Sequence, residues 1–251
     1  MASLAALALP LAKVGEVGKD FFHERSSETL SCQANPDKLF CFEWAKDNID
    51  RYGTPTVQHI ELVAISILAG FAVAFALALL AHRHHWLRTP LLAGTGALYT
   101  VPSVAFFFLL LPLTGRGRDT AIIALSAYTL QIIYRNTMTG LANVPASVKD
   151  AGRGMGLTGR QLLWRVELPL ATPEIVAGLR IATVSTVALA TLAVFAGGGG
   201  LGDPIYDHIT FTTNIILAGG IAMLMAIAFD LILLGIQRLA TPWLRAARGQ
   251  A

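Results

Sequence analysis

Charged side chains are scarce in this sequence. Only 14% of its 251 residues are charged, whereas 54% are hydrophobic and the mean hydropathy is +0.58. A soluble domain carries about a quarter charged residues, so the composition excludes an ordinary soluble protein and indicates a membrane protein. The net charge of +3 does not indicate a nucleic-acid partner, because the basic residues lie in short breaks between apolar runs and form no basic stripe.

Cysteine is nearly absent as well. The two cysteines, Cys32 and Cys41, precede the first apolar run, and neither belongs to a CxxC or Cys/His metal-binding spacing. If their segment lies outside the cell the two can form a disulfide, and two free thiols are the alternative. The stretch HRHH, residues 82–85, follows the first apolar run, so we interpret it as an interfacial anchor and expect no metal site.

Nucleotide-binding and catalytic motifs are missing too. The stretch GMGLTG, residues 154–159, fits G-x-G-x-x-G, but it follows helical and apolar sequence, whereas a dinucleotide site follows a strand. The sequence contains no Walker A motif and no Ser-His-Asp arrangement. We therefore expect no catalytic residue, no metal and no cofactor in this chain. An integral membrane enzyme, the alternative, would need paired acid and base groups or a metal cluster within the apolar runs, and none is visible.

Long apolar runs are what the sequence has instead. A helix needs roughly 20 apolar residues to cross a bilayer, and five runs approach that length. Pro102 removes a backbone donor from the middle of the second run, so we expect a kinked or broken helix there. The sequence therefore predicts an all-α integral membrane protein with about five transmembrane helices, at about 57–81, 90–113, 120–141, 173–196 and 212–239.

The loops between the runs predict the orientation. Lysine and arginine follow the first, third and fifth runs, and the loop after the fourth run has neither. By the positive-inside rule, the N-terminus lies outside and the C-terminus lies in the cytoplasm. We predict an extracytoplasmic N-terminal segment over residues 1–55 with short interfacial helices, a transmembrane domain over 56–240 and a cytoplasmic tail over 241–251.

The polar loop over residues 143–172 carries its own turn signals. Pro145 favours the start of a short helix, because proline fits the first helical positions. Gly154 or Gly156 supplies a residue that tolerates the left-handed backbone with which helices commonly end. The first half of the loop is therefore predicted to be a helix followed by a tight turn.

A second helix is predicted in the other half of the loop. Thr158 and Gln161 have the spacing of a capping box, which marks a helix start. Pro169 disfavours a helical residue before it, so this helix is expected to end at or before Leu168. The stretch TPE at 172–174 then predicts the start of the next helix. Because ordering this many exposed residues costs about 1–2 kcal/mol of backbone entropy each, we interpret the loop as a docking element rather than a solvated linker.

The stretch DAGRGMGLTGRQLLWRVELP, residues 150–169, resembles the EAA loop of permease subunits from binding-protein-dependent ABC importers. The family pattern is Glu-Ala-Ala, three residues, Gly, nine residues, Ile-x-Leu-Pro, and the spacing matches throughout, with Asp, Gly and Val as departures. The coupling helix needs small residues where it enters a groove of the ATPase subunit, and charge at the rim for register. The residues assigned to ATPase coupling are Asp150, Ala151, Gly152, Arg153, Gly156, Val166, Leu168 and Pro169.

The resemblance extends from about residue 59 to residue 238, and its apolar segments are similar to the branch that imports osmoprotectants. It implies a type I ABC importer permease (MetI-like) fold in the bacterial cytoplasmic membrane, with cargo such as glycine betaine, choline, carnitine or proline betaine. It also implies two ATPase subunits that bind ATP and Mg, a second permease that is identical or homologous, and an extracytoplasmic binding protein. An importer permease for another small solute, such as an amino acid, is the alternative. A self-contained channel or secondary carrier would not need a structured cytoplasmic loop.

Three of the charged residues inside the predicted spans call for a partner. They are Arg135, Arg180 and Asp230, and an unpaired charge at the centre of a membrane helix costs about 2.5–3.5 kcal/mol. Arg180 and Asp230 fall at similar depth, so we predict an Arg180–Asp230 pair or an Arg135–Asp230 pair. Snorkelling to the interface is the alternative for Arg135.

The residues that contact the cargo are harder to predict. A quaternary ammonium is held by aromatic faces through cation–π attraction, and the sequence shows no obvious aromatic cage. The resemblance implies that the tight site belongs to the separate binding protein, which leaves the permease a weak path. We assign Tyr99, Ser103 and Gln131 to this translocation path.

Overall fold

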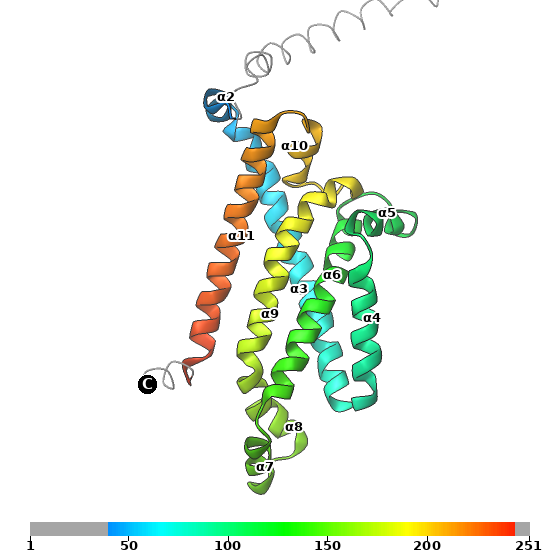
Figure 1. Ribbon diagram of the computed structural model, residues 1–251, viewed down its shortest axis with the longest axis vertical. Helices are drawn as coiled ribbons and strands as arrows, with labels where there is room; N and C mark the ends of the chain where they lie inside the picture. The colour runs from blue at the N-terminus through cyan, green and yellow to red at the C-terminus, as the bar shows by residue number, and fades with distance from the viewer. Residues whose placement is uncertain (1–39, 244–251) are drawn as a thin grey trace, which may run out of the picture.

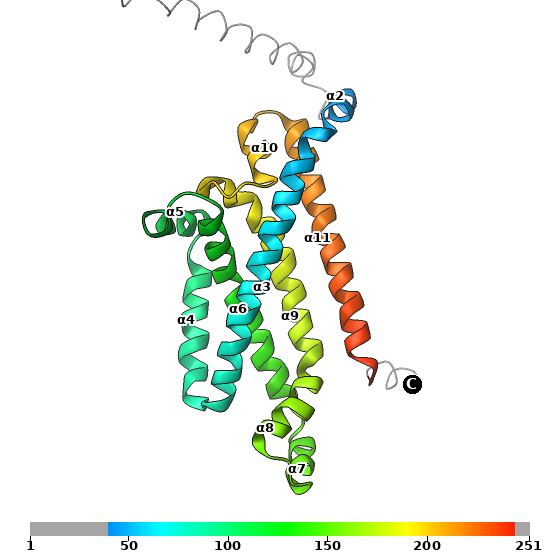
Figure 2. The ribbon, with the colours of Figure 1, turned by 180° about the vertical axis from the view of Figure 1, so that it is seen from behind.

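The protein is a bundle of long helices. The computed structural model describes residues 40–243, and this part of the chain contains no strand. The three central helices pack side by side, one further helix covers each flank, and the view from behind shows the same arrangement (Figures 1 and 2). The central helices are α3 (Gly53–Arg83), α6 (Arg118–Asn143) and α9 (Leu168–Ala190), and the flanking helices are α4 (Arg88–Thr100) on α6 and α11 (Thr212–Ala240) on α9.

Short elements close the two ends of the bundle. At one end, α2 and α10 lie near the start of α11, and α5 lies across the end of α6 (Figure 1). At the opposite end, α7 and α8 form a projecting tip (Figure 1). The short elements are α2 (Phe42–Asp47), η1 (Ile49–Tyr52), η2 (His85–Leu87), α5 (Ser103–Thr114), α7 (Ala146–Gly154), α8 (Gly159–Leu162), the π-helical turn η3 (Leu163–Glu167), η4 (Thr191–Ala196) and α10 (Gly202–Asp207).

Glycines allow the central helices to approach closely. A Cβ atom on Gly70 of α3 would lie 1.8 Å from Oγ1 of Thr129 on α6. A Cβ atom on Gly178 of α9 would lie 2.4 Å from Cβ of Asn136, also on α6. Small residues at such crossings are how membrane helices gain packing contacts, since lipid removes the hydrophobic drive between them. Both contacts therefore fix α6 in the middle of the bundle.

The number of apolar helices differs from the number predicted. In residues 40–243 three helices are long and apolar enough to cross a membrane, namely Ile49–Arg83, Gly159–Ala196 and Thr212–Ala240. The pair His85–Thr100 and Ser103–Thr114 makes a fourth span only if these two helices, bent by 99°, cross together. The bend falls at Pro102, so the predicted break in the second run is confirmed.

The span predicted at about 120–141 is a helix, α6, but it is not among the helices apolar enough to count as a span. Two of its buried threonines, Thr120 and Thr129, donate to backbone oxygens. Oγ1 of Thr120 donates to the carbonyl of Gly115, and Oγ1 of Thr129 donates to the carbonyl of Ser126 at 2.7 Å. Because α6 is surrounded by other helices, it tolerates a polarity that a lipid-facing helix would not, and five apolar spans are therefore not reached.

Candidate functional site

α7, the turn after it and α8 form the projecting tip of the molecule (Figure 1). α7 ends at Gly154, and the N–H of Leu157 donates to the carbonyl of Gly152 at 3.1 Å to close the turn. Gly156 lies in this turn with φ of +81°, in the left-handed region that other residues rarely adopt. The predicted helix stop at the glycines is confirmed.

The second helix of the loop begins as predicted. The N–H of Gln161 donates to Oγ1 of Thr158 at 3.4 Å, and the N–H of Thr158 donates to Oε1 of Gln161 at 2.9 Å. This reciprocal capping box satisfies two backbone donors that the first turn of α8 would otherwise leave without partners. The capping box therefore fixes where α8 begins.

The second helix does not end where predicted. α8, η3, α9 and η4 form one continuous helical rod over Gly159–Ala196. Pro169 lies at the start of α9, directly after the π-helical turn, which widens the backbone where the proline ring would otherwise meet a carbonyl of the preceding turn. Oγ1 of Thr172 donates to the carbonyl of Leu168 at 2.9 Å inside this rod and caps nothing. The predicted stop at Leu168 and the predicted start at Thr172 are both wrong.

The two small residues of α7 have different surroundings. Ala151 is exposed, but Gly152 is buried. A Cβ atom on Gly152 would lie 2.6 Å from Cδ1 of Leu162 and 3.5 Å from Cδ1 of Leu157. Gly152 therefore lets α8 pack against α7 within this chain, and its assignment to ATPase coupling stays a prediction.

The outer face of the tip carries both charged and large apolar side chains. Nη1 of Arg153 lies 3.1 Å from Oδ1 of Asp150, one helical turn earlier, and both side chains are largely exposed. An exposed pair of this kind contributes about 0.3–0.5 kcal/mol, so neither residue is needed to hold the fold. Met155 is 75% exposed and Trp164 is 53% exposed, which is unusual for large apolar side chains on a polar tip. The tip therefore presents a surface suited to contact with another molecule.

The second half of the motif lies inside the bundle. Leu168 is buried in a small cluster with Leu141, Ala171 and Ile175, where α6 and α9 meet. Val166 and Pro169 are half-buried beside it. These residues join the projecting tip to the base of α9, so a displacement of the tip would reach α9 through a continuous helix.

A pair that was not predicted from the sequence connects the end of α3 to η3, directly behind the tip. Nε2 of His82 lies 2.7 Å from Oε2 of Glu167, and Glu167 is 5% exposed. A cavity of about 920 Å³ lies beside the pair, and its lining includes Arg83, Arg153 and Trp164. The sequence showed a histidine at the end of an apolar run and an acidic residue inside the loop motif. It did not indicate that the two side chains lie close together in space.

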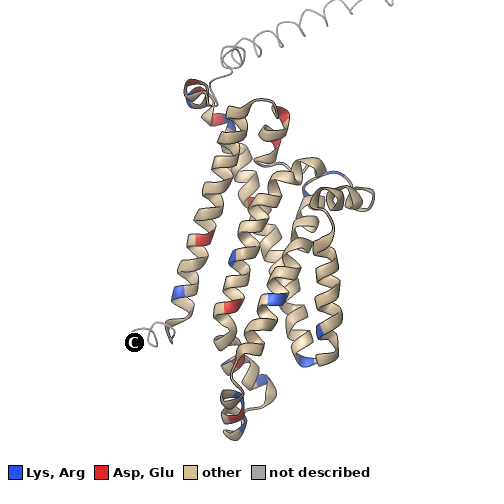
Figure 3. Ribbon diagram, viewed as in Figure 1, with Lys and Arg blue, Asp and Glu red and all other residues tan. Residues whose placement is uncertain are grey.

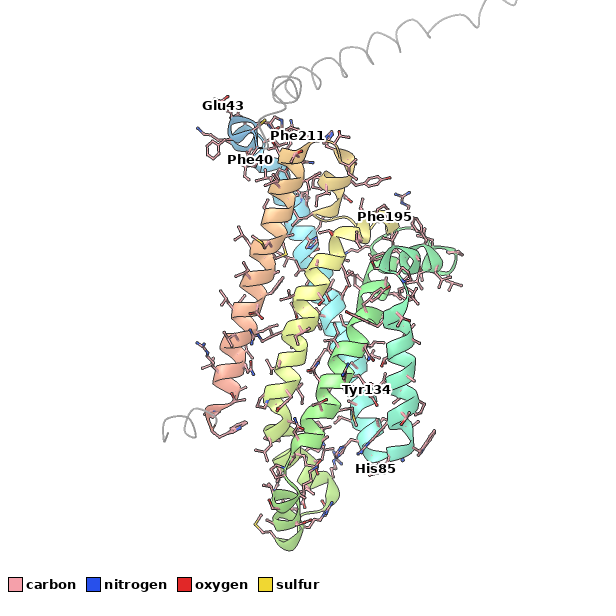
Figure 4. The ribbon with its side chains drawn as sticks, viewed as in Figure 1. Phe40, Glu43, His85, Tyr134, Phe195 and Phe211 are labelled. Atoms are coloured by element: carbon pink, nitrogen blue, oxygen red, sulfur yellow. The ribbon has the colours of Figure 1, made fainter. Side chains whose placement is uncertain are left out.

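We predict that replacing His82 with leucine destabilises the protein. The substitution leaves the buried carboxylate of Glu167 without its partner, and an unsatisfied buried acceptor costs about 1–3 kcal/mol. The matched control is His85→Leu, because His85 is exposed in the next turn at the same end of the bundle (Figure 4). The midpoint of thermal unfolding in detergent is the measurement, and equal midpoints for the two variants would contradict the prediction.

Of Arg135, Arg180 and Asp230, two form an ion pair. Nε of Arg180 on α9 donates to Oδ1 of Asp230 on α11 at 2.8 Å, and Nη2 donates to Oδ2 at 2.7 Å. Of the two predicted pairs, this is the one present. Arg135 is exposed, and within residues 40–243 it forms no ion pair. Figure 3 shows that charged residues are otherwise concentrated at the two ends of the bundle.

The residues assigned to the translocation path have different neighbours. Oγ1 of Thr95 on α4 donates to Oε1 of Gln131 on α6 at 2.5 Å, so Gln131 links two helices. The ring of Tyr99 lies edge-on to Tyr128 with centroids 6.0 Å apart, and Ser103 begins α5 after the bend. Their role in a path stays a prediction.

The four glycines after η4, residues 197–200, form a glycine-rich loop, and a buried histidine holds the end of this loop. His59 on α3 is fully buried, and its Nδ1 accepts the N–H of Leu201 at 3.2 Å. Its Nε2 lies 3.0 Å from the carbonyl of Val187 on α9, which requires the hydrogen on Nε2 and a neutral ring. One imidazole therefore connects α3, α9 and the loop. The sequence showed only a histidine at the start of an apolar run.

The predicted disulfide falls partly beyond the described residues. Cys41 is buried, and its N–H donates to Oγ1 of Thr213 at 3.0 Å. Cys32 lies outside the described residues, as do most of the N-terminal segment and the end of the C-terminal tail, so the pairing of Cys32 with Cys41 stays a prediction. In residues 40–243 no three His, Cys, Asp or Glu side chains gather as a metal site.

Several bacterial permease proteins are similar to most of the chain. The osmoprotectant import permease protein OsmW of Salmonella typhimurium is 37% identical over 203 residues, which cover 78% of this chain and 94% of OsmW. The choline transport system permease protein OpuBB of Bacillus subtilis is 35% identical over 189 residues, covering 74% of this chain and 87% of OpuBB. The carnitine transport permease protein OpuCB of Listeria monocytogenes is 38% identical over 167 residues, covering 66% and 77%.

A solved structure shares the fold. A chain of the MetNI methionine ABC transporter in an inward-facing conformation matches with a TM-score of 0.61 and 20% identity, covering 73% of this chain and 91% of that chain. At this identity the likeness shows the fold alone. The family model described as binding-protein-dependent transport system inner membrane component matches residues 66–246. This match includes the projecting tip and the rod behind it, and the chain belongs to the family of binding-protein-dependent transport system inner membrane components.

Proposed function

We propose that this chain is the permease subunit of an ATP-driven importer of osmoprotectants with a quaternary ammonium group, such as glycine betaine, carnitine or choline. The similarity to OsmW, which extends over 94% of that permease, carries the proposal. The similarity to permeases named for choline and for carnitine transport supports the same class of cargo. The likeness to the methionine transporter does not favour an amino acid as cargo, because it is a likeness of fold.

The projecting tip is the proposed contact with the ATPase subunit. Its outer face carries Asp150, Ala151 and Arg153 in an exposed turn of helix, which fits insertion into a groove with charged contacts at the rim. The continuous rod over Gly159–Ala196 supports this role, because a rod transmits a displacement that a flexible linker would absorb. ATP and Mg would be bound by the ATPase partner, two copies per transporter, and the transporter would include a second permease and an extracytoplasmic binding protein.

The proposed orientation places the tip in the cytoplasm. Lysine and arginine concentrate at the tip and at the turn between α3 and α4, and Figure 3 shows more blue than red at that end. Basic residues near the ends of the spans favour the cytoplasmic side. The start of α3, α5, α10 and the glycine-rich loop would then face the outside, where a binding protein delivers its cargo.

The experiment that tests the proposed function uses the whole transporter. The chain is produced with its ATPase, partner permease and binding protein in a bacterium that lacks its own uptake of quaternary ammonium compounds. Uptake of radiolabelled glycine betaine, carnitine, choline and methionine is compared at high external salt. We expect uptake of at least one of glycine betaine, carnitine and choline, and we expect this uptake to stop when ATP is depleted. Uptake of methionine alone would exclude the proposal.

A further inference from the structure

A cavity of about 550 Å³ lies at the proposed outer end of the bundle, near the position of Phe195 in Figure 4. Its size falls within the roughly 300–1,000 Å³ typical of small-molecule sites. Four parts of the chain contribute to it, namely α3, α5 with the turn after it, η4 with the glycine-rich loop, and α10. The lining combines three aromatic rings, two carboxylates and one guanidinium.

The aromatic rings of the cavity come from three separate elements. Phe195 of η4 stands between the other two, with its ring centroid 6.1 Å from that of Phe108 on α5 and 5.5 Å from that of Tyr206 on α10. The ring of Tyr206 meets that of Phe195 at 77°, so the rings present both faces and edges. Phe108 and Tyr206 are about half exposed. Ring faces left open in a cavity are what attracts a cation that carries no hydrogen-bond donor.

Carboxylates lie beside the aromatic rings. Asp203 and Asp207 are both on α10, one helical turn apart, and both line the cavity. Burial, and then the nearby charge of Asp207, raise the pKa of Asp203 above its ordinary value. Within residues 40–243 neither carboxylate has a basic side chain at ion-pair distance. A cation in the cavity would relieve both the repulsion and the loss of solvation.

A positive charge lies on another side of the cavity. Cγ and Nε of Arg116 come within 3.0 Å of the place that a Cβ atom on Gly197 would occupy, so the arginine side chain lies over the glycine-rich loop. The N–H of Gly117 donates to the carbonyl of Ala196 at 2.8 Å and holds the turn that carries Arg116. In the described part of the chain Arg116 forms no ion pair, whereas Arg118 on the same turn binds Glu61 at 2.8 Å. The guanidinium of Arg116 is therefore available to a carboxylate from outside the chain.

One wall of the cavity is glycine backbone held by hydrogen bonds. Gly197, Gly199 and Gly200 all have positive φ, and the N–H of Gly200 donates to Oε1 of Gln58 at 3.3 Å. A Cβ atom on Gly199 would lie 3.0 Å from Oε1 of Gln58 and 4.0 Å from Oδ2 of Asp203. His59 holds the next residue of the loop, as described above. The charged and aromatic groups thus stand around a backbone surface that has no side chain to fill the space.

We propose that this cavity binds a zwitterion that carries both a quaternary ammonium group and a carboxylate. The ammonium lies against the rings of Phe108, Phe195 and Tyr206 near Asp203, and the carboxylate is held by Arg116. The inference rests on the proposed function and adds to it a site in the permease itself, at its outer end. It also separates two kinds of cargo, because a betaine or carnitine has a carboxylate for Arg116 and choline has none.

The test compares Arg116→Gln with Arg118→Gln in the complete transporter. The readout is the ratio of glycine betaine uptake to choline uptake at limiting solute, because a ratio cancels differences in expression and in coupling to the ATPase. Loss of one charge-assisted hydrogen-bonded contact is expected to lower this ratio about tenfold in Arg116→Gln. Arg118→Gln, which changes a neighbouring arginine outside the cavity lining, is expected to leave the ratio as in the wild type.

A second variant tests the aromatic wall. Tyr206→Leu removes a ring that serves the ammonium of every cargo, so it is expected to lower the uptake of betaine and choline alike, by about five- to thirty-fold. Phe42→Leu is the control, because Phe42 is an exposed ring on α2 at the same end of the bundle and does not line the cavity.

The outcomes separate the two proposals. A transporter that imports betaine and choline, but whose betaine-to-choline ratio is unchanged by Arg116→Gln, overturns the cavity site and leaves the proposed function intact. Equal loss of uptake in Tyr206→Leu and Phe42→Leu overturns the aromatic wall in the same way. A wild-type transporter that imports neither solute overturns the proposed function and the cavity site together.

Discussion

Replacing Asp230 with asparagine is expected to destabilise the protein strongly. Arg180 would then keep its charge in the middle of α9 with no partner, and its side chain is only 26% exposed. Both helices of the pair are long and apolar enough to cross a membrane, where an unpaired charge is costly. Removing one member of the pair leaves the charge of the other uncompensated within a span, and we expect a clearly lower midpoint of thermal unfolding. Thermal unfolding in detergent and the yield of inserted protein are the measurements.

Three further variants decide whether the pair is the cause. Arg180→Gln together with Asp230→Asn removes both charges and should recover part of the loss. The exchange Arg180→Asp with Asp230→Arg should recover part of it too. Arg135→Gln changes an exposed arginine with no ion pair in the described part of the chain, and its effect should stay within about 0.5 kcal/mol. If neither double variant is more stable than Asp230→Asn alone, the pair does not stabilise the bundle.

Structural features that depend on a few consecutive residues could be predicted from the sequence. The bend at Pro102, the capping box of Thr158 and Gln161, and the left-handed turn at Gly156 each depend on a few consecutive residues. In each case a single physical constraint decides the outcome, either a missing backbone donor, a side chain that replaces a backbone partner, or a backbone angle that only glycine adopts without strain. The positions of these features therefore needed no knowledge of the rest of the fold.

Contacts between residues far apart in the sequence could not be predicted in the same way. Pro169 was expected to end a helix, but the surrounding bundle favours a continuous rod, and a π-helical turn absorbs the misfit. Gly152 was assigned to ATPase coupling, and the sequence did not indicate that Leu162 covers it from within the chain. The Arg180–Asp230 pair could be predicted because a charge in a span demands a partner, which restricts the choice to few residues. No comparable restriction connected His82 to Glu167.

The cavity at the outer end shows the same limit. Its aromatic residues are Phe108, Phe195 and Tyr206, which are far apart in the sequence and come from three elements. The sequence therefore showed no aromatic cage, and Tyr99, Ser103 and Gln131 were assigned to the path instead. The bend at Pro102, which turns α5 across the end of the bundle, is what brings Phe108 to the other two rings.

Replacing Gly156 with valine is expected to abolish uptake while the protein still inserts. A β-branched residue at φ of +81° is strained, and even an unbranched residue pays about 1–2 kcal/mol in the left-handed region. Relief of that strain changes the turn, and with it the direction of α7 relative to the rod over Gly159–Ala196. Because the proposed contact with the ATPase needs α7 in one orientation, stimulation of ATP hydrolysis by the cargo-loaded binding protein should fall to the unstimulated rate.

The matched control lies two residues earlier. Gly154 ends α7 without positive φ, and nothing lies within 4 Å of a Cβ atom built on it, so Gly154→Val adds the same side chain without strain. Nothing lies within 4 Å of a Cβ atom on Gly156 either, so the two variants differ in backbone strain and not in crowding within the chain. Gly154→Val should retain most of the stimulated ATPase rate. A Gly156→Val variant that retains it equally well would show that the orientation of α7 does not control coupling, and that the tip is not the contact through which ATP hydrolysis drives transport.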